Sequence, residues 1–325
     1  MPAFGFHASH EQVHPSELLA AVQHAEEAGF DAAMSSDHFS PWSERQGHSG
    51  FAWSWLGAAM QATRMPFGVV NAPGQRYHPA VIAQAIGTLS AMYPGRFWAA
   101  LGTGEASNEH ITATGWPHKQ VRNDRLRECV EIIRALLRGE EVSHHGLVRV
   151  DRARVWTRPS DPPPLLGAAV SVATARWCAT WADGLITVNA DPAQLRRMID
   201  AYREAGGRGR LHLQVHLSWA PEEAEAEAIA HDQWRSNVFL PPACWDIDSV
   251  ETFDAVSQEI TIERVRQVVN ISSHLGWHTA QLAAYAELGF DEIALHHVGQ
   301  RQDDWIEVFG AKVLPQLREA STEGA

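Results

Sequence analysis

The residues best suited to acid–base chemistry in this sequence are Asp37 and His38, which are adjacent. Imidazole titrates near neutral pH, and a neighbouring carboxylate can orient it and raise its pKa. Adjacent side chains often point apart, so the same carboxylate can also face a bound coenzyme. We interpret His38 as a general acid or base and keep a purely structural loop histidine as the alternative.

A second polar segment combines two glycines with acid and amide side chains. Gly102 and Gly104 precede Glu105 and Asn108, directly after an apolar run. Ser107 stands where a dinucleotide-binding fingerprint needs its third glycine, so that type of nucleotide site is excluded. Glu105 can stabilise the start of a helix and Asn108 can cap one, which are structural alternatives to a role in a site.

The sequence contains no motif typical of a metal site or a hydrolase. The histidine pairs His144–His145 and His296–His297 are adjacent, which is not the spacing of ligands on one helix. A nucleophile elbow and a phosphate-binding loop are also missing. The three cysteines show no paired spacing, which is typical of a reducing compartment. We therefore predict no metal and expect a cytoplasmic protein.

Short apolar runs alternate with stretches of helical periodicity along the whole chain, and these elements must position the polar residues. The predicted strands are 3–7, 32–34, 67–70, 97–101, 165–166, 184–188, 211–217 and 293–295. The predicted helices are 15–28, 52–62, one that begins at Pro79, 120–138, 172–182, 192–205, 221–234, 261–269, 277–288 and 303–318. About eight β/α pairs predict an α/β protein with a single (β/α)8 TIM barrel. We expect one domain over 1–325, with excursions at about 139–163, a hairpin and loop, and at about 235–260.

Active sites of such barrels lie at the carboxyl ends of the strands, and polar residues follow nearly every predicted strand. They are Ser9, His10 and Glu11; Asp37 and His38; Asn71; Thr103, Glu105 and Asn108; Ser171; Asn189; Ser218 and Trp219; and His296 and His297. The pattern therefore predicts one polar rim and one site.

Composition narrows the class of ligand. The 325 residues carry a net charge of −13 without a block of Lys or Arg, which disfavours nucleic acid and anionic membranes. No apolar run is long enough to span a bilayer. The chain holds 13 Trp, and Trp42, Trp53, Trp55 and Trp116 fall near the predicted rim. We therefore expect a small-molecule substrate that is apolar or aromatic.

The segment Ser36-Asp37-His38-Phe39-Ser40-Pro41-Trp42 resembles the active-site signature of the deazaflavin-dependent glucose-6-phosphate dehydrogenase family, which is part of the luciferase-like flavin oxidoreductase superfamily. Further matches follow in order at 7–12, 47–48, 54–55, 76–85, 102–109 and 182–184. The resemblance covers most of the chain and is dense over 5–138. It implies a barrel enzyme that moves a hydride between a substrate and a flavin or deazaflavin.

The resemblance also implies roles for individual residues. His38 would act as the acid or base on a substrate alcohol, Glu11 and Glu105 would lie near the reacting centre, and Trp42 would shape the pocket. The coenzyme would be held by Asp37, Asn71, Ala72, Gly104, Asn108, Ala168, Ala169 and Ser171. We expect its ring between the Asp37–His38 loop and the 70–74 loop, with its phosphate at the 168–172 turn, where a helix begins.

Two departures from the family pattern favour FMN over coenzyme F-420 (F420), although both coenzymes stay open. The stretch 70–74 is one residue shorter than the family's coenzyme loop, and Ala169-Val170 replaces a Gly-Gly near the phosphate. Asp191 falls near the place of the family's phosphate-reading lysine, and an acid there would repel a sugar phosphate. We therefore expect an alcohol or carbonyl substrate other than glucose 6-phosphate.

Three alternatives accompany this interpretation. They are a flavin-dependent monooxygenase of the same class, a non-catalytic flavin-binding barrel and a metal-dependent barrel hydrolase. The presence of Asp37, His38 and Glu105 weighs against the second, and the lack of ligand spacing weighs against the third. The resemblance further implies a homodimer.

Overall fold

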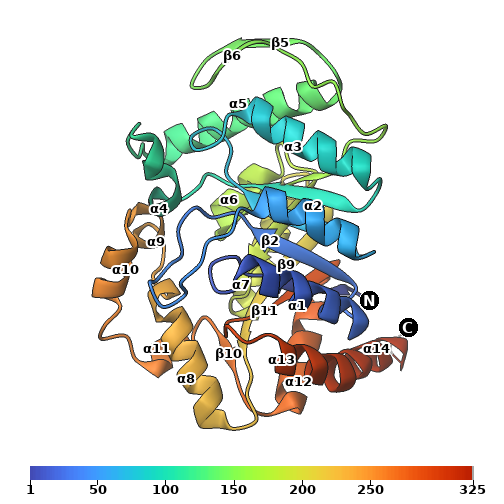
Figure 1. Ribbon diagram of the computed structural model, residues 1–325, viewed down its shortest axis with the longest axis vertical. Coiled ribbons are helices and arrows are strands. Elements are labelled where there is room, and N and C mark those ends of the chain that lie inside the picture. The colour runs from blue at the N-terminus through green and yellow to red at the C-terminus, as the bar shows by residue number, and fades with distance from the viewer. Residues whose placement is uncertain (324–325) are drawn as a thin grey trace.

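The structure, a computed structural model, describes residues 1–323, and a closed barrel of eight parallel strands forms its centre (Figure 1). The strands, in barrel order, are β1 (Ala3–Ala8), β2 (Ala32–Ser36), β3 (Phe67–Asn71), β4 (Phe97–Leu101), β7 (Leu165–Ala168), β8 (Gly184–Val188), β9 (Arg210–Ser218) and β11 (Glu292–His297). Each strand pairs with the next one in this order, and β11 pairs with β1 to close the barrel. The predicted barrel is confirmed, and all eight predicted strands occur.

Helices connect the strands and cover the outside of the barrel (Figure 1). They are α1 (Pro15–Glu27), α2 (Ala52–Ala62), α3 (Pro79–Met92), α4 (Ala106–Glu109), α5 (Lys119–Leu137), α6 (Val172–Cys178), α7 (Pro192–Glu204), α8 (Glu223–Trp234), α9 (Ala243–Asp246), α10 (Val250–Val256), α11 (Ile262–Val265), α12 (Leu275–Ala286), α13 (Asp303–Val308) and α14 (Leu314–Glu323). Helices α1, α3 and α7 begin with proline, whose fixed φ and missing amide proton suit the first helical position. Within the described chain, no helix combines the length and the apolar character needed to cross a membrane.

The helix predicted over 303–318 is interrupted in the structure. Helix α13 passes into a π-helical segment, Phe309–Val313, before α14 begins. Pro315 has no amide proton to donate, so the regular hydrogen-bond ladder cannot continue unchanged through this point. Other differences lie at element ends, since α6 stops at Cys178 and the helix predicted over 261–269 is limited to Ile262–Val265.

The two predicted excursions differ in structure. In the first, β5 (Val142–His145) and β6 (Arg149–Ala153) pair antiparallel in a sheet of their own, beyond α5 in Figure 1. The second, expected to be irregular, contains α9 and α10. A two-residue strand, β10 (Asn270–Ile271), pairs with β9 and is too short for sequence periodicity to reveal. The single domain over 1–325 stays a prediction.

Alternate residues of the barrel strands belong to two different apolar clusters. Phe67, Phe97 and Leu165 pack outward in the large core beneath the helices. The residues one position along face the barrel interior, where Met34, Trp98, Ala100, Leu166, Ile186 and Ala294 form a second cluster. Two residues beyond this cluster, toward the carboxyl ends of five of the strands, the inward-facing positions reach the mouth of the barrel. The positions reached there are Ser36, Gly102, Ala168, Val188 and His296.

Candidate active site

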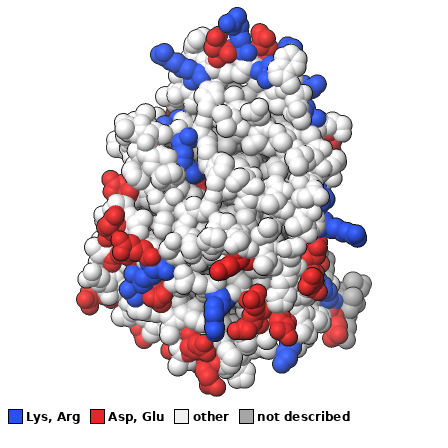
Figure 2. All heavy atoms as spheres, viewed as in Figure 1, with Lys and Arg blue, Asp and Glu red and all other residues white. Residues whose placement is uncertain are grey.

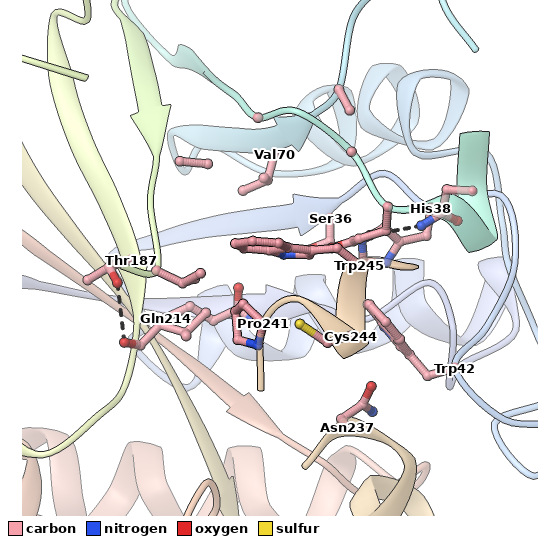
Figure 3. Close-up of a pocket in the computed structure, with 18 of the residues that line it drawn as sticks. Ser36, His38, Trp42, Val70, Thr187, Gln214, Asn237, Pro241, Cys244 and Trp245 are labelled. Carbon is pink, nitrogen blue, oxygen red and sulfur yellow. Dashed lines mark hydrogen bonds and ion pairs between the residues drawn. The ribbon is translucent and has the colours of Figure 1, made fainter. Parts of the chain in front are cut away.

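A cavity of about 500 Å³ opens at this mouth, within the range of small-molecule sites. Figure 3 shows His38 and Trp42 toward one end, Thr187 and Gln214 toward the other, and the Trp245 indole between them. The structure brings nearly all predicted site residues into its lining: Glu11, Asp37, His38, Trp42, Asn71, Ala72, Gly104, Glu105, Asn108, Ala168 and Ala169. Ser171 is the exception.

His38 is held from one side by a buried carboxylate, which belongs to Glu11. Nδ1 of His38 lies 2.5 Å from Oε1 of Glu11. A carboxylate can only accept, so Nδ1 carries the proton and donates it. The other ring nitrogen, Nε2, is 3.6 Å from Oε2 of Glu105, beyond ordinary hydrogen-bond length. Nε2 is therefore the nitrogen left to exchange a proton with a ligand.

The Glu11 carboxylate sets the charge of this imidazole. Burial lowers the pKa of His38, but the charge and hydrogen bond of Glu11 outweigh burial and raise that pKa to about 9. Burial in turn raises the pKa of Glu11, and the charge of His38 reverses this and lowers the pKa to about 2. The hydroxyl of Ser9 donates to Oε2 of Glu11 at 2.9 Å and fixes the carboxylate from behind. The pair is an imidazolium–carboxylate ion pair at neutral pH.

Asn108 ties the loop that carries His38 to Glu105. Its Oδ1 accepts from the amides of Phe39 at 2.8 Å and Ser40 at 3.1 Å, and its Nδ2 donates to Oε2 of Glu105 at 3.0 Å. Helix α4 positions this side chain, and Glu105 precedes that helix without capping it by its side chain. Asn108 therefore acts as a bridge and not as a helix cap.

The neighbour of His38 in sequence faces another direction. The Asp37 carboxylate accepts from Nδ2 of Asn71 at 2.8 Å, Nε1 of Trp53 at 3.2 Å and the hydroxyl of Tyr77 at 3.3 Å. Arg76 adds a charge contact at 3.6 Å. Asp37 therefore does not orient His38, which was one of the two positions left open for it, and its contact with a bound coenzyme stays a prediction.

The wall between the ends of β3, β4 and β7 consists of small residues, including Ala72, Gly104, Ala168 and Ala169. Gly104 has φ +74°, and a Cβ there would lie 2.8 Å from Cγ of Glu109, so this position requires glycine. A flat ring system can approach such a wall closely. Oδ1 of Asn71 is buried without a hydrogen-bond partner in the described chain, and the ring N–H of a flavin or deazaflavin would supply one. The residues present therefore fit this type of coenzyme.

Ser171 lies outside the lining of the cavity. Its Oγ accepts from the Thr174 amide at 3.2 Å as the cap of α6 and donates to the Thr174 hydroxyl at 2.9 Å. The serine next to a strand end therefore caps a helix here, and its contact with a coenzyme stays a prediction.

Aromatic side chains form the side of the cavity nearest His38. The Trp42 ring stands edge-on to His38 at 5.5 Å and to Phe253 at 5.3 Å. Trp234 and Trp245, from α8 and α9, also line the cavity. The other tryptophans expected at the rim are placed differently: Trp53 supports Asp37, Trp55 packs on Phe67 in the core, and Trp116 bonds to Asp246.

Sequence reasoning missed two groups of cavity residues. His7, His216 and Gln214 project from β1 and β9 and meet His296 inside the barrel, with the His7 and His296 rings 4.3 Å apart. Burial lowers the pKa of His7 to about 3 and that of His216 to about 4, so both are neutral. The inward alternation of β1 and β9 was the signal that could have identified them. Lys119 also lines the cavity, although it begins a helix far from any strand end.

The part of the chain that the structure describes contains no group of three or more His, Cys, Asp or Glu side chains arranged to hold a metal ion. The adjacent pairs His144–His145 and His296–His297 do not converge with further ligands. His144 instead pairs with Glu128 at 3.0 Å.

Comparison with known proteins identifies the class. The luciferase-like monooxygenase family matches residues 1–292, and the chain belongs to that family. Curated relatives include the F420-dependent glucose-6-phosphate dehydrogenases of Nakamurella multipartita, 34% identical over 99% of this chain and 98% of the relative, and of Microbacterium testaceum, 34% identical over 97% of each. The chain is accordingly an oxidoreductase of the luciferase-like class, as the sequence resemblance implied.

Solved structures agree with this assignment. An F420-dependent secondary alcohol dehydrogenase in complex with an F420–acetone adduct superposes with a TM-score of 0.89, at 28% identity over 98% of this chain and all of that one. The F420-dependent tetrahydromethanopterin reductase of Methanopyrus kandleri has a TM-score of 0.76 at 18% identity, which shows a shared fold.

Proposed function

We propose that this protein is an F420-dependent dehydrogenase that interconverts an apolar or aromatic alcohol and its carbonyl compound. The observation that carries the proposal is the His38 imidazole, with Nδ1 fixed by Glu11 and Nε2 free at the cavity. The deazaflavin, when bound, exchanges a hydride with the substrate carbon. The protein must then move one proton to or from the substrate oxygen.

His38 is the group placed for that proton. In carbonyl reduction the imidazolium donates from Nε2 to the oxygen, and in alcohol oxidation neutral Nε2 accepts the hydroxyl proton as the hydride leaves carbon. The Glu11 charge keeps the imidazole protonated at neutral pH, which favours the donor role. Trp42 and Phe253 keep water away from the same side of the cavity.

The substrate class follows from the lining around His38. On the side of His38 away from its carboxylate partners the side chains are aromatic. Trp42 packs on His38, Phe253 on Trp42, and Phe239 on Phe253. Asp191, also in the lining, accepts from the amides of Ala193 and Gln194 and would repel a sugar phosphate. We therefore infer an uncharged alcohol or carbonyl compound.

The coenzyme is proposed as F420. The sequence departures favoured FMN, and the relatives give that preference no support because the two dehydrogenases and the solved alcohol dehydrogenase described above are each named for F420. Equilibrium titration of the protein with F420 and with FMN decides between them. Binding of F420 at least tenfold tighter than FMN, with bleaching of the bound coenzyme by a secondary alcohol, is the expected result. Tight binding of FMN with substrate-dependent oxygen consumption would replace the proposal by a monooxygenase.

We further propose that the chain is a homodimer joined through α2 and α3. Neither 46–63 nor 77–94 contains Lys, Arg, Asp or Glu. Phe51, Val81 and Met92, in and beside these helices, are each more than half exposed. Figure 2 shows a broad area with few charged side chains on the face of the molecule turned to the viewer. Sedimentation of Val81→Asp should give a monomer while the wild type gives a dimer. Val256→Asp, at an exposed apolar residue of α10, is the control and should leave the dimer intact.

A further inference from the structure

Lysine is rare in this protein, and one of its lysines lies in the active-site cavity. Of 26 Lys and Arg residues, only Lys119 and Lys312 are lysine. Lys312 is exposed in the π-helical segment, whereas Lys119 lines the cavity. A lysine at the first position of a 19-residue helix also sits at the positive end of the helix dipole, which disfavours a cation. The stability of α5 therefore does not explain why a lysine occupies this position.

The Lys119 ammonium group has bonding capacity that the protein leaves unused. One N–H donates to the hydroxyl of Thr103 at 2.9 Å, and the group lies 4.6 Å from the centre of the Trp245 ring. An ammonium has three N–H donors. The other cations of the cavity are committed, since Arg76 contacts Asp37 and Glu109, and His38 contacts Glu11. Within the described chain the partners of Lys119 are a hydroxyl and an indole ring.

The ammonium is also partly removed from water. Burial, with the nearby charge of Arg122, lowers the pKa of Lys119 to about 8. The Glu105 charge attracts Lys119 but does not offset burial, and no carboxylate forms an ion pair with the ammonium in the described chain. A desolvated cation of this kind gains more from a bound anion than an exposed one does. The cavity therefore contains an anion-binding position on the side where Lys119 and Thr103 meet.

The position of that side indicates which anion it receives. Thr103 follows β4, and β4 is separated from β2, which precedes His38, by β3 alone. The other neighbour of β4 is β7, whose Ala168 lies against Gly102, so Thr103 and Lys119 adjoin the turn where the sequence predicts the coenzyme phosphate. This position suits the phosphate end of a ribityl chain whose ring lies against Asn71, Ala72 and Gly104. The aromatic residues around His38 occupy the side left for the substrate.

We propose that Lys119, together with Thr103, binds the phosphate of the coenzyme side chain. The proposal rests on the flavin-type coenzyme of the proposed function, but it does not depend on the choice between F420 and FMN, since both carry this phosphate. Lys119 would then contribute to the affinity for the coenzyme through the phosphate and not through the ring or the ribityl chain.

A comparison of two ligands across three variants tests this directly. Dissociation constants are measured by fluorescence titration for F420 and for the ribityl deazaflavin that lacks the phosphate and everything beyond it. Lys119→Met should weaken F420 binding by about 10- to 100-fold and change binding of the phosphate-free ligand by less than about twofold. Lys119→Arg should retain most of the affinity. Lys312→Met, the matched control at the other lysine, should bind both ligands like the wild type.

Two results would overturn the proposal. Equal weakening of both ligands by Lys119→Met would mean that the side chain only supports the cavity, and unchanged binding of both would mean that the phosphate lies elsewhere. If the wild type binds FMN and not F420, the F420 function fails while the same comparison, run with FMN and riboflavin, still tests Lys119.

A measurement on the unmodified protein covers the case in which the variant does not fold. Acylation of the wild type with a lysine reagent can label only two side chains, which mass spectrometry resolves. Bound coenzyme should protect Lys119 at least tenfold and leave Lys312 unprotected, while the phosphate-free ligand should protect Lys119 much less. Equal protection by both ligands contradicts phosphate binding.

Discussion

Replacing Glu11 with glutamine removes the charge that keeps the His38 imidazole protonated while retaining an oxygen that can accept from Nδ1. The pKa of His38 is about 9 against an ordinary 6.5, which corresponds to about 3 kcal/mol in favour of the protonated ring. Burial acts in the opposite direction, so without the Glu11 charge the pKa should fall to about 6.5 or lower. Glu105, at 3.6 Å, is left as a weaker source of attraction.

The sign of the effect differs between the two reaction directions. Alcohol oxidation needs neutral His38, so in the wild type its rate should rise about tenfold per pH unit up to pH about 9. Carbonyl reduction needs the protonated ring and should fall above the same pH. In Glu11→Gln both transitions should move to about pH 6.5 or below, and oxidation at pH 7 should lose its steep pH dependence.

Single-turnover reduction of the bound coenzyme by the alcohol, followed from pH 5.5 to 10, measures this without interference from product release. Glu105→Gln is the matched control because it removes a carboxylate that makes no hydrogen bond to the ring, and its transition should move much less. An unchanged transition in Glu11→Gln would refute the role of Glu11. A wild-type transition near 6.5 would refute the ion pair itself.

Three further predictions concern the same site. His38→Ala should bind the coenzyme normally while single-turnover reduction falls by about 10²- to 10⁴-fold, and a parallel loss of binding and stability would make His38 structural. Asn108→Leu removes two hydrogen bonds to loop amides and should lower the free energy of unfolding in urea by about 1–3 kcal/mol, together with turnover. Glucose 6-phosphate should not reduce the bound coenzyme at a rate approaching that of an uncharged secondary alcohol, and a comparable rate would contradict the proposed substrate class.

The barrel could be predicted because each strand is a short apolar run bounded by polar residues and followed by helical periodicity. The same alternation put His38 and Glu105 correctly at strand ends. It also explains why Asp37 does not orient His38: successive residues leaving a strand point in different directions, and the Asp37 carboxylate turns to Asn71, Trp53 and Tyr77 instead of to the imidazole. The orienting carboxylate comes from Glu11, after the adjacent strand, because β1 pairs with β2.

Other parts of the site had no local signal in the sequence. Lys119 comes long after β4 ends and reaches the cavity only because the intervening loop folds back over the barrel. Ser171 carried an ambiguous signal, since a serine before a helix has the same pattern whether it caps the helix or binds a phosphate. The π-helical segment before α14 did have a signal, Pro315, which helical periodicity alone does not take into account.

The buried neutral histidines of the barrel and its surrounding layer set a lower pH limit for the folded enzyme and make its acid unfolding steep. Burial lowers the pKa of five of them to about 3 or 4: His7, His10, His216, His278 and His297. The unfolded chain takes up these protons near pH 6.5 and the folded one does not, so stability present above that pH is lost as the pH falls. At about 1.4 kcal/mol per proton and pH unit, five sites remove about 7 kcal/mol per unit. A typical stability of 5–15 kcal/mol would be used up within about two units. Acid titration followed by circular dichroism should therefore show a steep unfolding transition between pH 4 and 6, and a protein that stays folded at pH 3.5 would contradict it.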